Sequence, residues 1–197
     1  MHPVQFDVDF VESRSRLTTF FRLLLAIPHL LVAYLWAIPV CIVWIIAWFA
    51  ILFTGKFPQG MWKFTRDWLT YWSRVTAYAS LLADPFPPFG AGGQYPARLQ
   101  VEGPGSHSRW KGLLVLLLAI PAYVVAYLLQ LARGVVSILC WFIIVITGRQ
   151  VEGLQGFMEL CMRFEMRFFA YVLLLTDRYP SFATENATAS PQIADVR

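Results

Sequence analysis

The sequence predicts a mainly α-helical integral membrane protein built from two tandem copies of one unit. Three observations lead to this fold class. The chain is 58% hydrophobic and only 14% charged, a composition outside that of ordinary soluble domains. It contains two long apolar runs, residues 23–53 and 116–146, each longer than a membrane-crossing helix requires. Both runs end in the same pattern, Thr-Gly followed by a basic residue.

The two halves align without a gap when the chain is shifted by 147 − 54 = 93 positions. The hexapeptide Leu-Leu-Leu-Ala-Ile-Pro occurs at residues 23–28 and again at 116–121. Proline, glycine and aspartate also keep this register, which a shared apolar bias cannot produce: Pro28 matches Pro121, Thr54 and Gly55 match Thr147 and Gly148, and Asp84 matches Asp177. We therefore divide the chain into repeat 1 (2–89), a linker (90–94), repeat 2 (95–182) and a polar tail (183–197) that we expect to be disordered.

Each repeat is predicted to begin with a short β-strand. Apolar and polar residues alternate over residues 4–10 and again over 97–102, the pattern of a half-buried strand. An isolated two-stranded sheet is only marginally stable. We therefore expect the two strands to pair across a pseudo-twofold axis and to rest on the amphipathic helices of the two repeats.

Each apolar run is interpreted as a kinked transmembrane helical hairpin, at residues 17–53 and 110–146. A run such as 23–53 would be about 46 Å long as one helix, against about 30 Å for the hydrocarbon core. Pro39 and the Arg133-Gly134 pair lie near the middle of the runs, which places Arg133 near the far-side turn. Basic residues flank both ends of both runs, and basic flanks favour the cytoplasmic side. Two crossings per repeat put the pseudo-twofold axis along the membrane normal. One long tilted span per run is the alternative.

The segments 61–82 and 154–175 are predicted to be amphipathic helices that lie in the membrane interface on the cytoplasmic side, together with the chain termini. Their apolar residues recur at three- and four-residue spacing. We expect Pro28 and Pro121 to kink the first arms, Gly55 and Gly148 to stop the apolar helices, and Asp84 and Asp177 to begin turns after the amphipathic helices.

Two kinds of candidate site follow from this arrangement. Basic side chains at headgroup depth are candidate contacts for anionic lipid headgroups: Lys56, Lys63, Arg66, Arg149, Arg163 and Arg167. His29 lies inside the first apolar run and is a candidate intramembrane polar site. A neutral, hydrogen-bonded histidine is favoured over a proton relay, because the matching residue in the second repeat is Ala122.

The sequence indicates no catalytic, metal or cofactor site. The three histidines are dispersed, and the three cysteines follow no metal or redox spacing. No basic block suggests a nucleic-acid partner. Transporters usually carry polar groups in mid-membrane, and these runs offer few. A membrane enzyme and a transporter are therefore both disfavoured.

Three segments resemble a known family: Ala-Ile-Pro-His, Ala-Trp-Phe-Ala-Ile-Leu-Phe-Thr-Gly-Lys-Phe-Pro, and Asp-Pro-Phe-Pro-Pro-Phe. In this order they are similar to a bacterial membrane family known as domain of unknown function 4389, over roughly residues 2–182. The second repeat departs from the pattern at Ala122 and at Gln150-Val151. The resemblance implies a bacterial multi-pass protein of the cell membrane and carries over no activity, ligand or catalytic residue.

Two functions fit these features. The first is a non-enzymatic accessory or scaffold subunit of a larger membrane complex, with a membrane-protein partner or self-association. Its wide aromatic and apolar helix faces suit protein contact. The alternative is a lipid-binding or bilayer-shaping module that uses interfacial helices and basic residues. We lean towards the first, because supporting another protein is the most general use of a small membrane protein without a chemical site.

Overall fold

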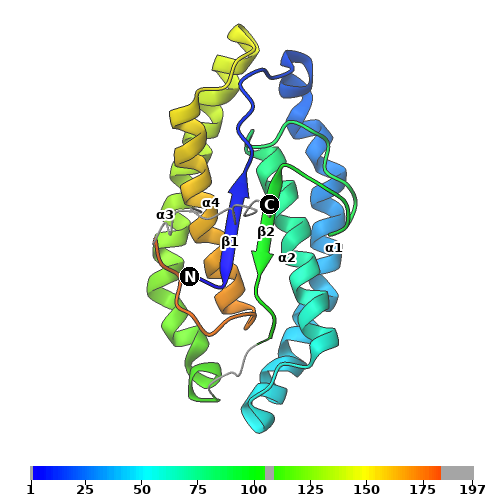
Figure 1. The fold of residues 1–197 in the computed structure, drawn as a ribbon, viewed down its shortest axis with the longest axis vertical. Helices are drawn as coiled ribbons and strands as arrows, with labels where there is room; N and C mark the ends of the chain where they lie inside the picture. The colour runs from blue at the N-terminus through cyan, green and yellow to red at the C-terminus, as the bar shows by residue number, and fades with distance from the viewer. Residues whose placement is uncertain (1, 105–108, 183–197) are drawn as a thin grey trace, which may run out of the picture.

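The structure is a computed structural model that describes residues 2–104 and 109–182, with the side chains of residues 111–113 excepted. The predicted tail, residues 183–197, lies outside the described residues. Each repeat contributes one strand, one long helix and one shorter helix (Figure 1). In chain order the elements are β1 (Val4–Val8), α1 (Arg16–Thr54), α2 (Gln59–Ala79), β2 (Ala97–Val101), α3 (Arg109–Thr147) and α4 (Glu152–Val172).

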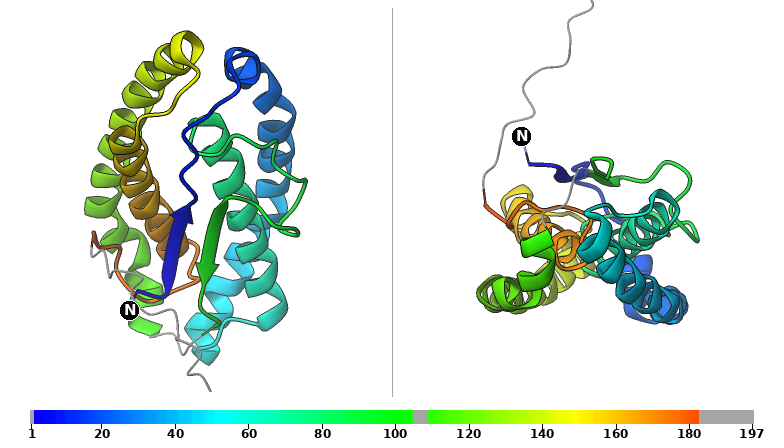
Figure 2. Two further views of the ribbon diagram at one scale, coloured as in Figure 1. Left: turned by 45° about the horizontal axis from the view of Figure 1, so that its top comes forward. Right: turned by 90° about the horizontal axis from the view of Figure 1, so that it is seen from below.

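The elements form three layers, which Figure 2 shows in the view along the helices. The two-stranded sheet is one outer layer, α2 and α4 form the middle layer, and α1 and α3 form the other outer layer. The strands bury every second residue: Val4, Phe6 and Val8 are at most 5% exposed. These side chains pack on the helices of the middle layer in one hydrophobic core. The prediction that the strand pair rests on the amphipathic helices is therefore confirmed.

The strand register locates the axis that relates the two repeats. β1 and β2 pair in antiparallel fashion, with Phe6 opposite Leu99. These two residues are repeat equivalents, which means that they occupy the same position in the two repeats, because 99 − 6 = 93. The pseudo-twofold axis therefore passes between them, perpendicular to the sheet. The Arg14 amide before α1 donates to the Gly148 carbonyl after α3 at 3.0 Å, so the two long helices are antiparallel and the axis is also perpendicular to them (Figure 1).

The predicted hairpins are wrong: each apolar run forms one continuous helix of 39 residues. Helix α1 runs through Pro28 and Pro39, and α3 runs through Pro121. A proline removes only one backbone hydrogen bond, and the packing of α1 stays continuous on both sides of it. Its buried residues include Ala26, Ala33, Val40 and Ala47, one every seven positions, which forms the narrow seam of a coiled-coil-like contact.

Arg133 does not lie at a turn, as the hairpin interpretation required. It lies within α3, is 6% exposed, and forms an ion pair with Glu165 of α4. The hairpin interpretation placed this charge near the far-side turn. The structure instead supplies a buried partner from another helix, a contact that the local pattern could not reveal.

The predicted amphipathic helices are confirmed as helices, and each ends three residues earlier than expected, at Ala79 and Val172. Their apolar sides do not face outward, however. Trp68, Leu69 and Tyr71 of α2 are at most 9% exposed, because α2 and α4 are held between the long helices and the sheet. Helices α2 and α4 thus form the middle layer, and their predicted position in the membrane interface stays a prediction.

Candidate membrane-binding surface

The outward sides of α1 and α3 form a continuous apolar surface. We call the exposed apolar side chains of α1 from Leu23 to Phe53, and of α3 from Leu116 to Ile146, the apolar face. Leu35 and Leu128, near the middle of the two helices, are 58% and 59% exposed. Both helices are long and apolar enough to cross a membrane, yet only 17% and 22% of their most apolar stretches are buried inside the protein. An exposed apolar surface of this extent marks a membrane or protein contact.

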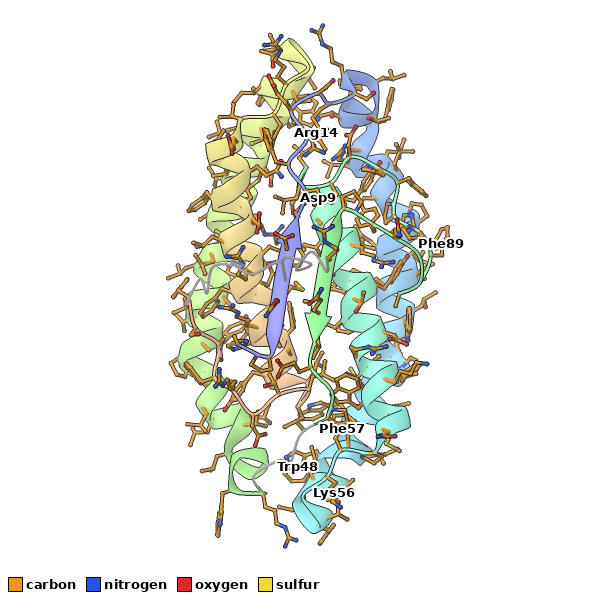
Figure 3. The ribbon with its side chains drawn as sticks, viewed as in Figure 1. Asp9, Arg14, Trp48, Lys56, Phe57 and Phe89 are labelled. Carbon is orange, nitrogen blue, oxygen red and sulfur yellow. The ribbon has the colours of Figure 1, made fainter. Side chains whose placement is uncertain are left out.

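The opposite layer is polar. Gln5 and Asp7 of β1, and Arg98 and Gln100 of β2, point away from the core and are exposed. Arg98 donates to Asp7 at 2.9 Å and to Asp9 at 2.6 Å. The hydrogen bonds that Arg98 donates to these two carboxylates raise its pKa. Asp9 lies beside the end of β1 in Figure 3. The molecule is therefore a slab with one apolar and one polar outer layer.

Three of the six predicted headgroup contacts are exposed. Lys56 follows α1 and Arg149 follows α3, so they lie at opposite ends of the molecule, with Lys56 labelled at one end in Figure 3. Arg149 is 3.7 Å from Glu12, with a side chain that remains 75% exposed. Lys63 is exposed on the first turns of α2. These side chains can meet an anionic group without breaking a buried contact.

The other three predicted contacts take part in structural interactions. Arg66 donates to the neighbouring Asp67. Arg163 pairs with Glu159 and donates to the Phe6 carbonyl at 3.1 Å. Arg167 is 4% exposed and donates to the Val4 carbonyl at 3.2 Å. The last two arginines therefore attach strand β1 to α4, and we assign them this structural role.

The repeated Thr-Gly motifs are helix caps, as predicted. Gly55 and Gly148 have φ values of 71° and 75°, in the left-handed region that glycine enters at little cost. The amide of Gly55 donates to Ile51 at 2.8 Å. Thr54 and Thr147 each donate from the hydroxyl to a carbonyl four residues back. The motif thus ends both long helices identically, and only the following basic residue is open to a ligand.

His29 is completely buried. Its Nδ1 and the Tyr71 hydroxyl share a hydrogen bond of 2.8 Å. The rings of Phe86 and Phe89 cover the imidazole, with centroids 4.4 Å and 4.3 Å away. The predicted hydrogen-bonded histidine is therefore present, and it holds the loop after α2 against α1.

Sequence reasoning missed two ion pairs that buried arginines form. The Arg133 guanidinium is 3.0 Å from Glu165 and also donates to the Ser80 hydroxyl. Arg22, only 1% exposed, pairs with Asp84 beyond the end of α2. One signal was available for Arg133: an arginine inside an apolar run requires a buried partner. Which carboxylate supplies it depends on the packing of different helices.

Within the described part of the chain, no group of three or more His, Cys, Asp or Glu side chains could hold a metal ion. A family profile matches residues 16–91 and 109–184. The two matches begin 109 − 16 = 93 residues apart, which reproduces the repeat offset. No curated protein and no solved structure is significantly similar to the chain. The resemblance noted in the sequence is confirmed, and the chain belongs, in two tandem copies, to the family described as Domain of unknown function (DUF4389).

Proposed function

We propose that this protein is a non-enzymatic, lipid-binding module that lies flat in one leaflet of a membrane and reshapes the bilayer. In this arrangement the apolar face of α1 and α3 is embedded in hydrocarbon, and the sheet faces water. The observation that carries the proposal is the opposite polarity of the two outer layers. Such a slab has one favourable orientation at a membrane surface, with its layers parallel to the bilayer.

The position of the sheet argues against helices that stand along the membrane normal. The strands lie over the middle of the long helices (Figure 1). In an upright molecule Asp7, Asp9 and Arg98 would therefore lie at the depth of the hydrocarbon. Charged side chains and open sheet edges are both costly there. In addition, a helix of 39 residues is about 58 Å long, almost twice the hydrocarbon thickness of about 30 Å.

The distribution of basic residues supports the flat arrangement. Arg16 begins α1 and Lys56 follows it, so both ends of this helix are basic. Basic flanks favour the cytoplasmic side of a membrane. A flat helix places both ends on one side, whereas a single upright crossing places them on opposite sides. The pseudo-twofold axis, which is perpendicular to the long helices, then coincides with the membrane normal.

Bilayer shaping follows from the one-sided insertion. Two long helices add volume to one leaflet and none to the other, which favours curvature towards the side that carries the sheet. Lys56 and Arg149 would hold the two ends of the molecule at the headgroups, each contributing about 1 kcal/mol near an anionic surface.

The orientation is tested by labelling the two ends of α1. Cysteine is placed at Ser15 or at Lys56, and sealed membrane vesicles are treated with a membrane-impermeant maleimide. The flat arrangement predicts that both positions react from the same side. The native Cys41, exposed in the second half of α1, is the internal control and is expected to stay unreactive in hydrocarbon. Reaction of Ser15→Cys and Lys56→Cys from opposite sides would reject the proposal in favour of an upright helix.

Membrane shaping is tested by adding the purified protein to giant vesicles with and without anionic lipid. We expect outward tubulation or a fall in vesicle size that depends on protein density in the membrane. A variant with Arg98→Ala, altered only on the water-facing sheet, is the matched control and should act like the wild type. If the protein binds the vesicles fully without any change in their shape, the lipid-binding part of the proposal stands and the bilayer-shaping part is rejected.

An accessory or scaffold subunit is the second candidate, and the asymmetry of the sheet edges favours it. Arg163 and Arg167 cover the outer edge of β1. Their repeat equivalents near β2 act differently: Thr70 donates to Arg66, and Arg74 donates to the loop carbonyls of residues 90–93. The edge of β2 is thus the less protected one and suits an added strand from a partner.

Purification from native membranes in a mild, lipid-preserving detergent separates the two candidates. Mass spectrometry of protein and lipid is the measurement. A stoichiometric protein companion would favour the accessory role, and its loss on Leu99→Pro at the β2 edge would locate the contact. Recovery of the chain alone, enriched in one lipid class, would favour lipid binding.

A further inference from the structure

A groove of about 240 Å³ lies between α1, the end of α2 and the second half of α3. Leu23, Leu81, Ile138 and Phe142 supply most of its apolar lining, and Arg22 and Ser137 are its polar residues. Leu23 and Ile138 are 71% and 61% exposed and belong to the apolar face. The groove therefore opens on the side that the proposed function places in hydrocarbon.

The matching position in the other half of the molecule is filled. The repeat equivalent of Ser137 is Trp44, because 137 − 44 = 93. The Trp44 indole nitrogen donates to the Val172 carbonyl at 2.8 Å, and Val172 is the equivalent of Ala79, which lines the groove. Ser137 and Ala79 therefore leave the groove open in one half of the molecule. The larger side chains of Trp44 and Val172 fill the equivalent position in the other half.

The same comparison identifies the polar end of the groove. Arg22 replaces Val115, its repeat equivalent. Its guanidinium donates to the Tyr78 and Ala83 carbonyls and pairs with Asp84, so it is held firmly in place. Its Nε is buried and has no hydrogen-bond partner. Buried polar groups normally have a partner, and this N–H therefore indicates a missing acceptor.

The local charge favours an anionic acceptor. Burial lowers the pKa of Arg14, the negative charge of Asp84 raises it, and the positive charge of Arg22 lowers it. Arg14 is 5% exposed and donates to Gln155 at 3.0 Å. Two arginines thus share one carboxylate, which leaves an excess positive charge close to the groove. A carboxylate would balance this charge, and an ester carbonyl would supply only the hydrogen-bond acceptor.

We propose that the groove binds one acyl chain whose terminal oxygen accepts from the Nε of Arg22; the Ser137 hydroxyl already donates to the Ser80 carbonyl at 3.3 Å, and its small side chain leaves the space for the chain. The hydrocarbon lies along Leu23, Ile138 and Phe142 and enters from the bilayer. The ligand is an acyl group from either of two sources, a free fatty acid or a phospholipid ester, and the charge around Arg22 favours the free acid. The proposal rests on the proposed membrane contact, because the bilayer is the source of the ligand.

The test uses photo-crosslinking on the full chain purified in detergent micelles. The probes are palmitate with a diazirine in the middle of the chain, and phosphatidylcholine that carries the same chain. We expect palmitate to crosslink to peptides that contain residues 22–23 or 138–142, and unlabelled palmitate to compete. Stronger labelling by the phospholipid probe would assign the ester as the source.

Ser137→Trp is the decisive variant, because Trp44 shows that the fold accepts this side chain at the equivalent position. Filling the groove should lower specific crosslinking by about tenfold or more, equivalent to at least about 1.4 kcal/mol of binding. Leu128→Trp, 59% exposed on the same helix outside the groove, is the matched control and should label like the wild type. Equal labelling of Ser137→Trp and wild type, or crosslinks spread over the whole apolar face, would overturn the proposal.

Vesicle flotation of the same variants separates this inference from the proposed function. Ser137→Trp should still bind vesicles, because the apolar face is unchanged. Loss of crosslinking with intact flotation supports the groove as the acyl site. Failure of the wild type to float would reject the membrane contact, whereas flotation without specific crosslinking would reject only the acyl site.

Discussion

Removing the charge of Glu165 is predicted to destabilise the protein strongly, because it leaves Arg133 without its buried partner. The two side chains are 6% and 8% exposed, and the Arg133 nitrogen and the Glu165 oxygen are 3.0 Å apart. Removing one member of such a pair typically costs about 3–5 kcal/mol. Glu165→Gln keeps the shape of the side chain, so the loss comes from the uncompensated arginine and not from a cavity.

Replacing both partners with apolar residues should recover most of this loss. The repeat equivalents of Arg133 and Glu165 are Val40 and Trp72, so the same architecture already accommodates an apolar pair in its other half. We expect the double variant Arg133→Met with Glu165→Met to lie within about 1–2 kcal/mol of the wild type, since apolar replacement of buried ion pairs is often neutral. The adaptable methionine side chain limits the cost of imperfect packing.

The assay is equilibrium unfolding in mixed micelles, followed by circular dichroism, on the wild type, both single methionine variants and the double variant. Glu12→Gln is the matched control for Glu165→Gln: Glu12 is 63% exposed opposite Arg149, and its loss should cost at most about 0.5 kcal/mol. The reasoning fails if Glu165→Gln is as mild as Glu12→Gln. It also fails if the double variant is no more stable than the single ones.

Two further predictions follow from the structure. Gly148→Ala places a side chain at φ 75° and should lower the free energy of unfolding by about 1–2 kcal/mol. Gly60→Ala is the control: nothing lies within 4 Å of the added carbon, so the free energy of unfolding should not fall. Lys56→Ala combined with Arg149→Ala should weaken partitioning onto anionic vesicles by about 2 kcal/mol, roughly thirtyfold, and leave neutral vesicles unaffected; unchanged partitioning in vesicle sedimentation would exclude these residues as headgroup contacts.

The sequence by itself determined the duplication, the two strands and the ends of the long helices. These features depend on residues close in the chain or on comparison of the two halves. The alternation of residues 4–8 gives the strand, and Gly55 with Gly148 gives the helix ends, because backbone geometry constrains these positions locally. The family profile, which matches at the same offset, agrees with the register that proline and glycine set.

Only the tertiary structure decided the path of the apolar runs, the position of α2 and α4, and the partners of the buried charges. Pro39 and Arg133 are equally compatible with a turn or with a continuous helix, and the outcome depends on what packs against them. Glu165 meets Arg133 because α4 folds back along α3. The open groove beside Ser137 follows from a difference between the two halves, Ser137 against Trp44, that has meaning only once α1, α2 and α3 are placed together. Long-range packing energies, which a one-dimensional pattern does not contain, select among these alternatives.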